Sequence, residues 1–193
     1  MKKLVFATHN AHKLHEIQKI LGGIYHVIGF HELGFVEDIP EIADTLEGNA
    51  QIKAEYIYNQ LGEDCFSDDT GLEIEALQGA PGVYSARFAG EKCSFEENIN
   101  KVLKLLQGVS NRNACFRSVI CLILNGKRYF FEGKVEGIII EEPKGTSGFG
   151  YDPIFVPKGY TETFAEMQLE KKNNISHRGK AVKKLTDFLN EIR

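Results

Sequence analysis

The sequence predicts an α/β or α+β fold, in which helices flank a central mixed β-sheet. Apolar residues at helical spacing recur in four segments, and short runs rich in Val, Ile and Phe lie between them. An Asn-Gly pair joins two of those runs, which is typical of a β-hairpin turn. The combination of strand-helix alternation and a hairpin favours a mixed sheet.

Length and composition predict one folding unit, a single domain over residues 1–193. The chain has 42% hydrophobic and 26% charged residues, as a globular protein does. Its formal net charge of -4 argues against nucleic acid as a partner, because binding to phosphate backbones needs clustered Lys and Arg. No segment is long and apolar enough to span a membrane, so we expect no membrane partner.

The cysteines favour a reduced protein in the cytoplasm. They form no CxxC pair, and a chain of this size does not require a disulfide scaffold. The charged start of the chain is followed by too short an apolar run for a secretory signal. The cysteines are Cys65, Cys93, Cys115 and Cys121.

The N-terminal part of the chain predicts a strand and two helices. A buried strand over residues 3–8 precedes a helix over residues 13–21, which Gly22-Gly23 ends. A second helix covers residues 46–61 and ends at Gly62. We expect a capping box from Asp44 to Glu47 at its start. The apolar positions of the two helices are Leu14, Ile17 and Leu21, then Ala50, Ala54, Ile57 and Leu61.

Two further helices follow the same rules. One begins with a capping box from Ser94 to Glu97 and ends at Gly108, and the last begins near Ser176. Their expected buried residues are Ile99, Val102, Leu103 and Leu106, then Val182, Leu185, Phe188, Leu189 and Ile192.

Between these helices the sequence predicts a hairpin and a long loop. Residues 117–124 and 128–135 are strands on either side of Asn125-Gly126, and residues 135–142 are expected to add another strand. The Gly- and Pro-rich segment 143–158 is an ordered loop with a short strand at residues 153–156.

The loop Thr8–Lys13 joins the first strand to the first helix, where free backbone amides and the helix dipole attract anions. Thr8 and Asn10 can donate hydrogen bonds, and Lys13 adds a positive charge, although no Walker pattern is present. The alternative is an ordinary N-cap followed by a surface lysine. The spacing of His9, His12 and His15, without acidic or thiol neighbours, favours exposed or packed histidines over a metal site.

Acidic residues predict a second chemical feature. Capping explains Asp44 and Glu47, whereas Glu41 is left to combine with the adjacent Asp68 and Asp69 around a hard cation such as magnesium, or simply to be solvated. The acidic residues of the segment around Glu41 are Glu37, Asp38, Glu41, Asp44 and Glu47.

The adjacent pair Asp68-Asp69 repels itself unless a cation or a proton intervenes, which indicates a metal ligand or a general base. The alternatives are an Asx-turn or a helix cap, which the strand-like residues that follow disfavour.

Two other features indicate a ligand. Phe149 lies between glycines, where a ring can stack on a flat molecule, although a tight turn is an alternative. The cations Lys172, His177 and Arg178 lie near a helix start, where they oppose the dipole, so we expect a ligand to supply the missing negative or electron-rich partner.

These stretches, in this order, resemble the inosine/xanthosine triphosphate pyrophosphatase family, also called Ham1-like, over nearly the whole chain. The resemblance rests on T-x-N-x-x-K at Thr8 to Lys13, on "SDDTGL", "GAPGVYSARFAG" and "GFGYDPIF", and on "ISHRGKA" with Lys172 four residues before its serine.

The resemblance implies a homodimeric enzyme with two lobes and an active-site cleft between them. It implies magnesium-dependent cleavage of ITP, dITP or XTP into the monophosphate and pyrophosphate. The implied catalytic residues are Asp69 and Asp68, and Glu41 and Asp69 are the implied Mg²⁺ ligands. The implied substrate-binding residues are Thr8, His9, Asn10, Ala11, His12, Lys13, Lys53, Thr70, Phe149, Gly150, Tyr151, Asp152, Lys172, His177 and Arg178.

Two other functions use the same residues. A nucleotide sensor would keep the binding residues without turnover, and a triphosphatase would release orthophosphate from the γ position. The identity of the product separates these alternatives.

Overall fold

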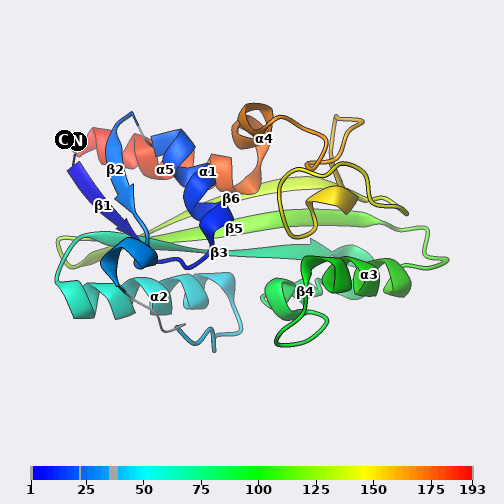
Figure 1. Cartoon of the computed structure of the whole chain (residues 1–193), viewed down its shortest axis with the longest axis horizontal. Helices are drawn as coiled ribbons and strands as arrows, with labels where there is room; N and C mark the ends of the chain where they lie inside the picture. The colour runs from blue at the N-terminus through cyan, green and yellow to red at the C-terminus, as the bar shows by residue number, and fades with distance from the viewer. Residues whose placement is uncertain (1, 22, 35–38, 193) are drawn as a thin grey trace. The chain divides into compact units, whose positions relative to one another are not determined.

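The computed structural model describes residues 2–21, 23–34 and 39–192. Contacts divide the chain into two compact units. The first unit comprises Met1–Asp69, Ser118–Gly133 and Arg178–Arg193, and the second comprises Thr70–Arg117 and Lys134–His177. Three strands contribute residues to both units: β3 (Cys65–Ile74), β5 (Asn113–Leu124) and β6 (Lys127–Ile139) (Figure 1).

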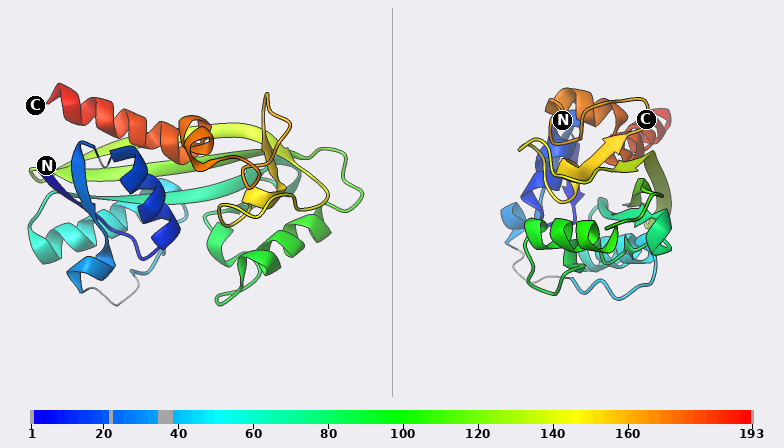
Figure 2. Two further views of the ribbon diagram at one scale, coloured as in Figure 1. Left: turned by 45° about the horizontal axis from the view of Figure 1, so that its top comes forward. Right: turned by 90° about the vertical axis from the view of Figure 1, so that its right-hand side faces the viewer.

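The first unit is a sheet covered by helices on both faces. Strand β1 (Lys2–Phe6) pairs in parallel with β2 (Tyr25–Ile28) and with β3. Side chains alternate along β1. Leu4 and Phe6 pack with residues of α1 (Ala11–Leu21) and α5 (His177–Glu191), and Val5 packs with residues of α2 (Leu46–Leu61). Figures 1 and 2 show α1 and α5 on one face of the strands and α2 on the other.

The second unit has its own apolar core. Strand β4 (Pro81–Gly82) pairs antiparallel with β3, and β7 (Phe155–Pro157) pairs antiparallel with β6. The remaining helices are α3 (Phe95–Leu105) and α4 (Leu169–Ile175), and the 3-10 turns of the chain are η1 (Phe30–Leu33), η2 (Glu75–Leu77), η3 (Ser85–Arg87) and η4 (Asp152–Ile154). The core includes Leu72, Val102, Phe116, Phe155 and Phe164. The predicted mixed sheet flanked by helices is confirmed.

Most predicted elements match the structure. Helix α2 has the predicted bounds and ends at Gly62 with φ 65°, and Ser94 begins α3 with the predicted capping box. The hairpin turn is also confirmed, with φ 51° at Asn125 and 75° at Gly126. Seven of the described elements were not predicted: β2, β4, α4 and the 3-10 turns η1, η2, η3 and η4, all of them short.

Two expectations about strands and helices are wrong. Residues 135–142 do not form a separate strand, because β6 continues without interruption to Ile139. Ile192 is 50% exposed rather than buried, because α5 ends at Glu191. Gly22, where the first helix was expected to end, lies outside the described residues, as do the acids Glu37 and Asp38.

The capping box expected from Asp44 to Glu47 is also wrong. Helix α2 begins at Leu46, so Thr45 is the N-cap and its Oγ1 accepts a hydrogen bond from the Gly48 amide at 3.1 Å. The third helical position is then Gly48, which has no side chain to complete a box. Asp44 lies one residue too early and is exposed.

This difference predicts unequal effects on stability. Thr45→Ala should lower the free energy of unfolding by about 1 kcal/mol, because the first turn of α2 loses its cap. Asp44→Ala should change it by less than about 0.5 kcal/mol, as a substitution at an exposed site does. Urea denaturation of both variants measures the difference, and a larger loss for Asp44→Ala would contradict the assignment of the cap.

All four cysteines are free, as expected. Burial raises the pKa of Cys65 and of Cys121 to about 12, so both thiols are protonated at neutral pH. Within the described residues, no helix combines the length and apolarity that crossing a membrane requires.

Candidate active site

The loop after β1 is held in shape by its own side chains. Thr8 Oγ1 accepts a hydrogen bond from the Asn10 amide at 3.1 Å, and Asn10 Oδ1 accepts from the His12 and Lys13 amides at 3.0 and 3.1 Å. Asn10 therefore caps α1, as the ordinary N-cap alternative expected. Lys13, however, is not a surface lysine, because its Nζ lies 2.9 Å from Asp68 Oδ1 and its side chain is only 13% exposed.

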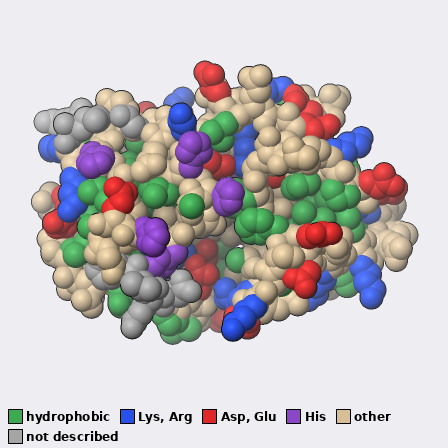
Figure 3. All heavy atoms as spheres, in the orientation of Figure 1, with side chains coloured by type: hydrophobic (Ala, Val, Ile, Leu, Met, Phe, Trp, Pro, Cys, Tyr) green, Lys and Arg blue, Asp and Glu red, His purple; other side chains and the backbone are tan. Residues whose placement is uncertain are grey.

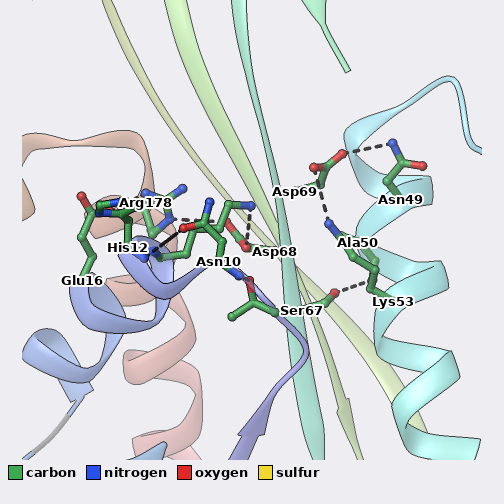
Figure 4. A network of polar contacts seen from close by, with 12 residues as sticks. Asn10, His12, Glu16, Asn49, Ala50, Lys53, Ser67, Asp68, Asp69 and Arg178 are labelled. Carbon is green, nitrogen blue, oxygen red and sulfur yellow. Dashed lines mark hydrogen bonds and ion pairs between the residues drawn. The ribbon is translucent and has the colours of Figure 1, made fainter. Parts of the chain in front are cut away.

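Asp68 lies at the centre of a buried charge network (Figure 4). Its Oδ1 contacts Lys13, and its Oδ2 lies 3.3 Å from Arg178 Nε. Arg178 also forms a close ion pair with Glu16 of α1, and both side chains are buried. Burial by itself would raise the pKa of Asp68, but Lys13, Arg178 and Lys53 lower it well below its usual range. Asp68 is therefore an ionised counter-ion.

The same network acts on its cations. Burial lowers the pKa of Lys13 despite the opposing attraction of Asp68. For Arg178, burial is outweighed by Glu16 and Asp68, so its pKa is raised and the guanidinium stays charged.

Asp69 points to the opposite face of β3, toward α2, because neighbouring strand residues alternate (Figure 4). Its Oδ2 accepts a hydrogen bond from Asn49 Nδ2 at 3.1 Å, and its Oδ1 lies 3.6 Å from Lys53 Nζ. The pair thus lies within a strand, and the Asx-turn and helix-cap alternatives are wrong. Separate cations on the two faces accommodate the adjacent charges.

The electrostatics of Asp69 differ from those of Asp68. Burial raises the pKa of Asp69, with contributions from Glu41 and Asp68, and outweighs the lowering effect of Lys53 and Lys13. Two neighbouring carboxyl groups whose pKa values move in opposite directions are suited to different roles in acid-base chemistry. Asp69 is the one suited to accept a proton.

Glu41 and Asp69 form the carboxylate pair that could hold a metal. Lys53 Nζ lies 2.5 Å from Glu41 Oε1 and 3.6 Å from Asp69 Oδ1. Burial opposes the charge on Lys53, but these two carboxylates raise its pKa. The carboxylates of Glu41 and Asp69 both lie close to the Lys53 ammonium group, so they can also supply oxygen ligands to one metal ion. Such ligands fit Mg²⁺, which binds through one or two carboxylates and keeps water or phosphate as its other ligands.

The three histidines near the first loop lie at the surface. His9, His12 and His15 are exposed, and Figure 3 shows histidine side chains in the left and central parts of the face in view. Among residues 2–21, 23–34 and 39–192, no three His, Cys, Asp or Glu side chains gather in a way that could hold a metal.

A second group of candidate residues lies in the second unit. Lys172 Nζ is 2.7 Å from Asp152 Oδ2 and 5.2 Å from the centre of the Phe149 ring. The same Asp152 oxygen accepts a hydrogen bond from the Phe149 amide at 2.9 Å. Lys172 is 3% exposed and Asp152 is 3% exposed, while Phe149 is half-buried. The carboxylate thus positions both an ammonium group and an aromatic ring.

The other predicted residues of this unit have structural contacts. Tyr151 is buried and donates a hydrogen bond to the Ser85 carbonyl at 2.8 Å. His177 is buried and stacks on Phe116, with ring centres 4.6 Å apart. Thr70 follows Asp69 on β3 and is half-buried, and Gly150 has a φ of 61°.

The cations near the last helix do not need a ligand to balance them. Asp152 partners Lys172, and Glu16 and Asp68 partner Arg178. The expectation that a ligand supplies the missing negative charge is therefore wrong for these two side chains. Sequence reasoning did not assign Glu16 or Asn49 to the site. The signal for both was a polar residue beside a buried apolar one, Ile17 or Ala50.

Gly148 is required for the position of Asp152. A Cβ at Gly148 would lie 2.1 Å from Asp152 Oδ2, and its φ of 77° disfavours other residues. Gly159 has a similar φ of 87° with nothing within 4 Å of such a Cβ. Both alanine variants should lose roughly 1 to 3 kcal/mol of stability through backbone strain.

Only Gly148→Ala should also raise the KM for the substrate, because it displaces the carboxylate that holds Lys172 and the Phe149 amide. Steady-state kinetics of Gly148→Ala and Gly159→Ala, beside their thermal unfolding, measure this. Equal KM values in the two variants would contradict the role of Gly148.

Comparison with known proteins decides the family. The family model described as Ham1 matches residues 4–188. The chain belongs to the Ham1 family. It is similar to a protein named dITP/XTP pyrophosphatase from Porphyromonas gingivalis, with 56% identity over 98% of both chains. It is also 53% identical to the protein of the same name from Flavobacterium johnsoniae, over 97% of both chains.

Solved structures of Ham1 proteins share the fold. The Ham1 protein of Coxiella burnetii is 41% identical, with a TM-score of 0.90, over 99% of this chain and 100% of that one. The Ham1 protein of Staphylococcus aureus is 40% identical, with a TM-score of 0.89, over 100% of both chains. The family resemblance seen in the sequence is thus confirmed.

Proposed function

We propose that this Ham1 protein is a dITP/XTP pyrophosphatase, with residues 1–193 acting as a single pyrophosphatase domain. It hydrolyses ITP, dITP and XTP to the nucleoside monophosphate and pyrophosphate, which removes non-standard purines from the nucleotide pool. The observation that carries the proposal is the division between Asp68, an ionised partner of Lys13, and Asp69, a carboxyl group of raised pKa beside Lys53. Nearly the full length of the chain matches relatives that carry this name.

The first unit would bind the triphosphate. Amides and side chains of Thr8–Lys13 surround the start of α1, where the helix dipole favours an anion. Lys13 and Lys53 are cations that can neutralise phosphate charge as it develops. His9 lies in the loop and Ala11 and His12 lie in the first turn of α1, and they would contribute through their backbone or exposed side chains.

Asp69 would act as the general base. It takes a proton from water as the water oxygen forms a bond to the α-phosphorus, and the bond from that phosphorus to the bridging oxygen of the β-phosphate breaks. Pyrophosphate leaves with the electron pair. Asp68 assists by holding Lys13 in place. Glu41 and Asp69 would hold Mg²⁺, which when bound neutralises phosphate charge.

The base and sugar would contact the second group of residues. Phe149, Gly150, Tyr151 and Asp152 are assigned to the sugar and base, with Thr70 as a further substrate contact. Lys172, His177 and Arg178 would contact the edge of the purine. Donors facing a 6-oxo group would meet an amino donor in adenine, and each unpaired buried donor costs roughly 1 to 3 kcal/mol. ATP should therefore be a poor substrate.

The test is hydrolysis of ITP, XTP, GTP and ATP by the purified protein with magnesium, with pyrophosphate and orthophosphate measured separately. We expect pyrophosphate from ITP and XTP and little product from ATP. Orthophosphate as the first product would indicate attack at the γ position. Tight binding without product would make the protein a nucleotide sensor. Either result would overturn the proposal.

The remaining parts of the proposal come from the family resemblance. They are a homodimer, a cytoplasmic location and the cleft that holds the substrate. Sedimentation of the purified protein tests the first of these.

A further inference from the structure

The side-chain amide of Asn49 is buried, and both its NH₂ group and its oxygen form hydrogen bonds. Asn49 lies on the first turns of α2 and is 0% exposed. Its Nδ2 donates to Asp69 Oδ2 at 3.1 Å (Figure 4). Its Oδ1 accepts from the Ala43 amide at 2.9 Å. Burying an amide is costly unless both ends are hydrogen-bonded, and here both are.

The contact with Asp69 has a direction. The NH₂ group of an amide only donates, so Asp69 Oδ2 must be its acceptor. An amide does not ionise, so it fixes the carboxyl group without adding charge beside Glu41 and Asp69. Lys53 follows Asn49 by four residues and lies on the same face of α2. Lys53 contacts Oδ1 while Asn49 contacts Oδ2, so two consecutive turns of one helix determine how the carboxyl group is rotated.

The second contact of Asn49 reaches the segment that carries Glu41. Ala43 follows Glu41 by two residues, in the non-helical stretch before α2. The hydrogen bond from its amide to Asn49 attaches that stretch to the helix. Asn49 therefore holds Asp69 directly and, through Ala43, holds the segment that carries Glu41. Asp69 and Glu41 are the two carboxylates that contact Lys53.

Other contacts hold α2 against β3. Ser67 Oγ donates a close hydrogen bond to the Ala50 carbonyl. Ala50, Ala54 and Ile57 are fully buried in the core of the first unit. These contacts hold α2 in place independently of Asn49. The hydrogen bond from Asn49 can therefore orient Asp69.

We propose that Asn49 is a positioning residue that orients the Asp69 carboxyl group for proton transfer from the attacking water. This role rests on the proposed function. It predicts that Asn49 affects the rate of the chemical step more than it affects nucleotide binding, because its two side-chain hydrogen bonds go to Ala43 and Asp69 rather than to the phosphate loop.

The test uses Asn49→Asp and Asn49→Ala with Asn59→Asp as the matched control. Asn49→Asp keeps an acceptor for Ala43 but loses the donor to Asp69, and Asn49→Ala loses both. Asn59 is an exposed residue of the same helix. We expect kcat for ITP to fall about 10- to 100-fold in both Asn49 variants, as a misplaced catalytic group causes, while the control matches the wild type.

Two readouts separate positioning from a purely structural role. The Kd for ITP, measured without magnesium, should stay within about 3-fold of the wild type, since one tenfold step would require about 1.4 kcal/mol of lost binding. The double variant Asn49→Asp with Asp69→Asn exchanges donor and acceptor. Its thermal midpoint should recover relative to Asn49→Asp, while its turnover stays low because the base is gone.

The outcomes are distinct. If the wild type releases pyrophosphate and both Asn49 variants keep its kcat, the positioning role is overturned and the proposed function stands. Loss of ITP binding in step with kcat, or a double variant no more stable than Asn49→Asp, also overturns the role. A wild type that releases no pyrophosphate from any substrate overturns the proposed function, and this role with it.

Discussion

Asp69→Asn should lower kcat for ITP by at least about 100-fold, because removal of a general base typically costs 10²- to 10⁴-fold. The asparagine keeps the size of the side chain and an oxygen that can accept from Asn49. It lacks the charge that takes a proton from water. Pyrophosphate release from ITP with saturating magnesium measures the effect.

The fold should survive this substitution. Burial raises the pKa of Asp69, so its ionised form is less favourable in the folded protein than in the unfolded chain. Such a group costs stability above its unfolded pKa and stops costing it as the pH falls below that value. At neutral pH the neutral asparagine should therefore leave the thermal midpoint unchanged or raise it.

Asp44→Asn is the matched control, because Asp44 is an exposed acid in the segment before α2. It should keep the turnover of the wild type. Near wild-type turnover in Asp69→Asn would exclude Asp69 as the base, and an unfolded variant would contradict the electrostatic account of its burial.

Arg178→Ala should lower the free energy of unfolding by about 3 to 5 kcal/mol, the usual effect of removing one partner from a buried ion pair. Arg178 is 2% exposed and contacts Glu16 and Asp68, which are also buried. The variant removes the guanidinium from Glu16, while Asp68 keeps its ion pair with Lys13. Urea unfolding at neutral pH measures the loss.

Arg128→Ala supplies the comparison for Arg178→Ala. Arg128 pairs with Glu55 in the same unit, but its side chain is 51% exposed and that of Glu55 is 38% exposed. Water screens such a pair, so the loss should be about 0 to 1 kcal/mol. Similar losses in the two variants would mean that the buried network contributes no more than a surface pair.

Local elements could be predicted because their signals are local. The Asn125-Gly126 hairpin needs two residues that accept positive φ, and α2 has its apolar positions one turn apart with a glycine at its end. The cap of α2 was misplaced by one residue, because Asp44 and Thr45 are both good caps and only the true start of the helix distinguishes them.

The motifs and their order predicted which residues belong to the candidate site. They did not predict which of those residues contact one another. Sequence reasoning brought Asp68, Asp69 and Glu41 together around a cation. It did not find that the two aspartates have different partners, nor did it assign Glu16 or Asn49 to the site. Glu16 and Arg178 are 162 residues apart, and no local pattern reports such a pairing.

The sequence by itself determined most of the longer strands and helices, the Ham1 motifs and the residue types of the site, because each depends on neighbours along the chain. Only the tertiary structure decided the different surroundings of Asp68 and Asp69. Their side chains leave β3 on opposite faces, where Asp68 meets Lys13 of α1 and Arg178 of α5, and Asp69 meets Lys53 of α2. Packing of the helices against the sheet, with the burial that it imposes, therefore makes one carboxyl group a permanent anion and the other a candidate base.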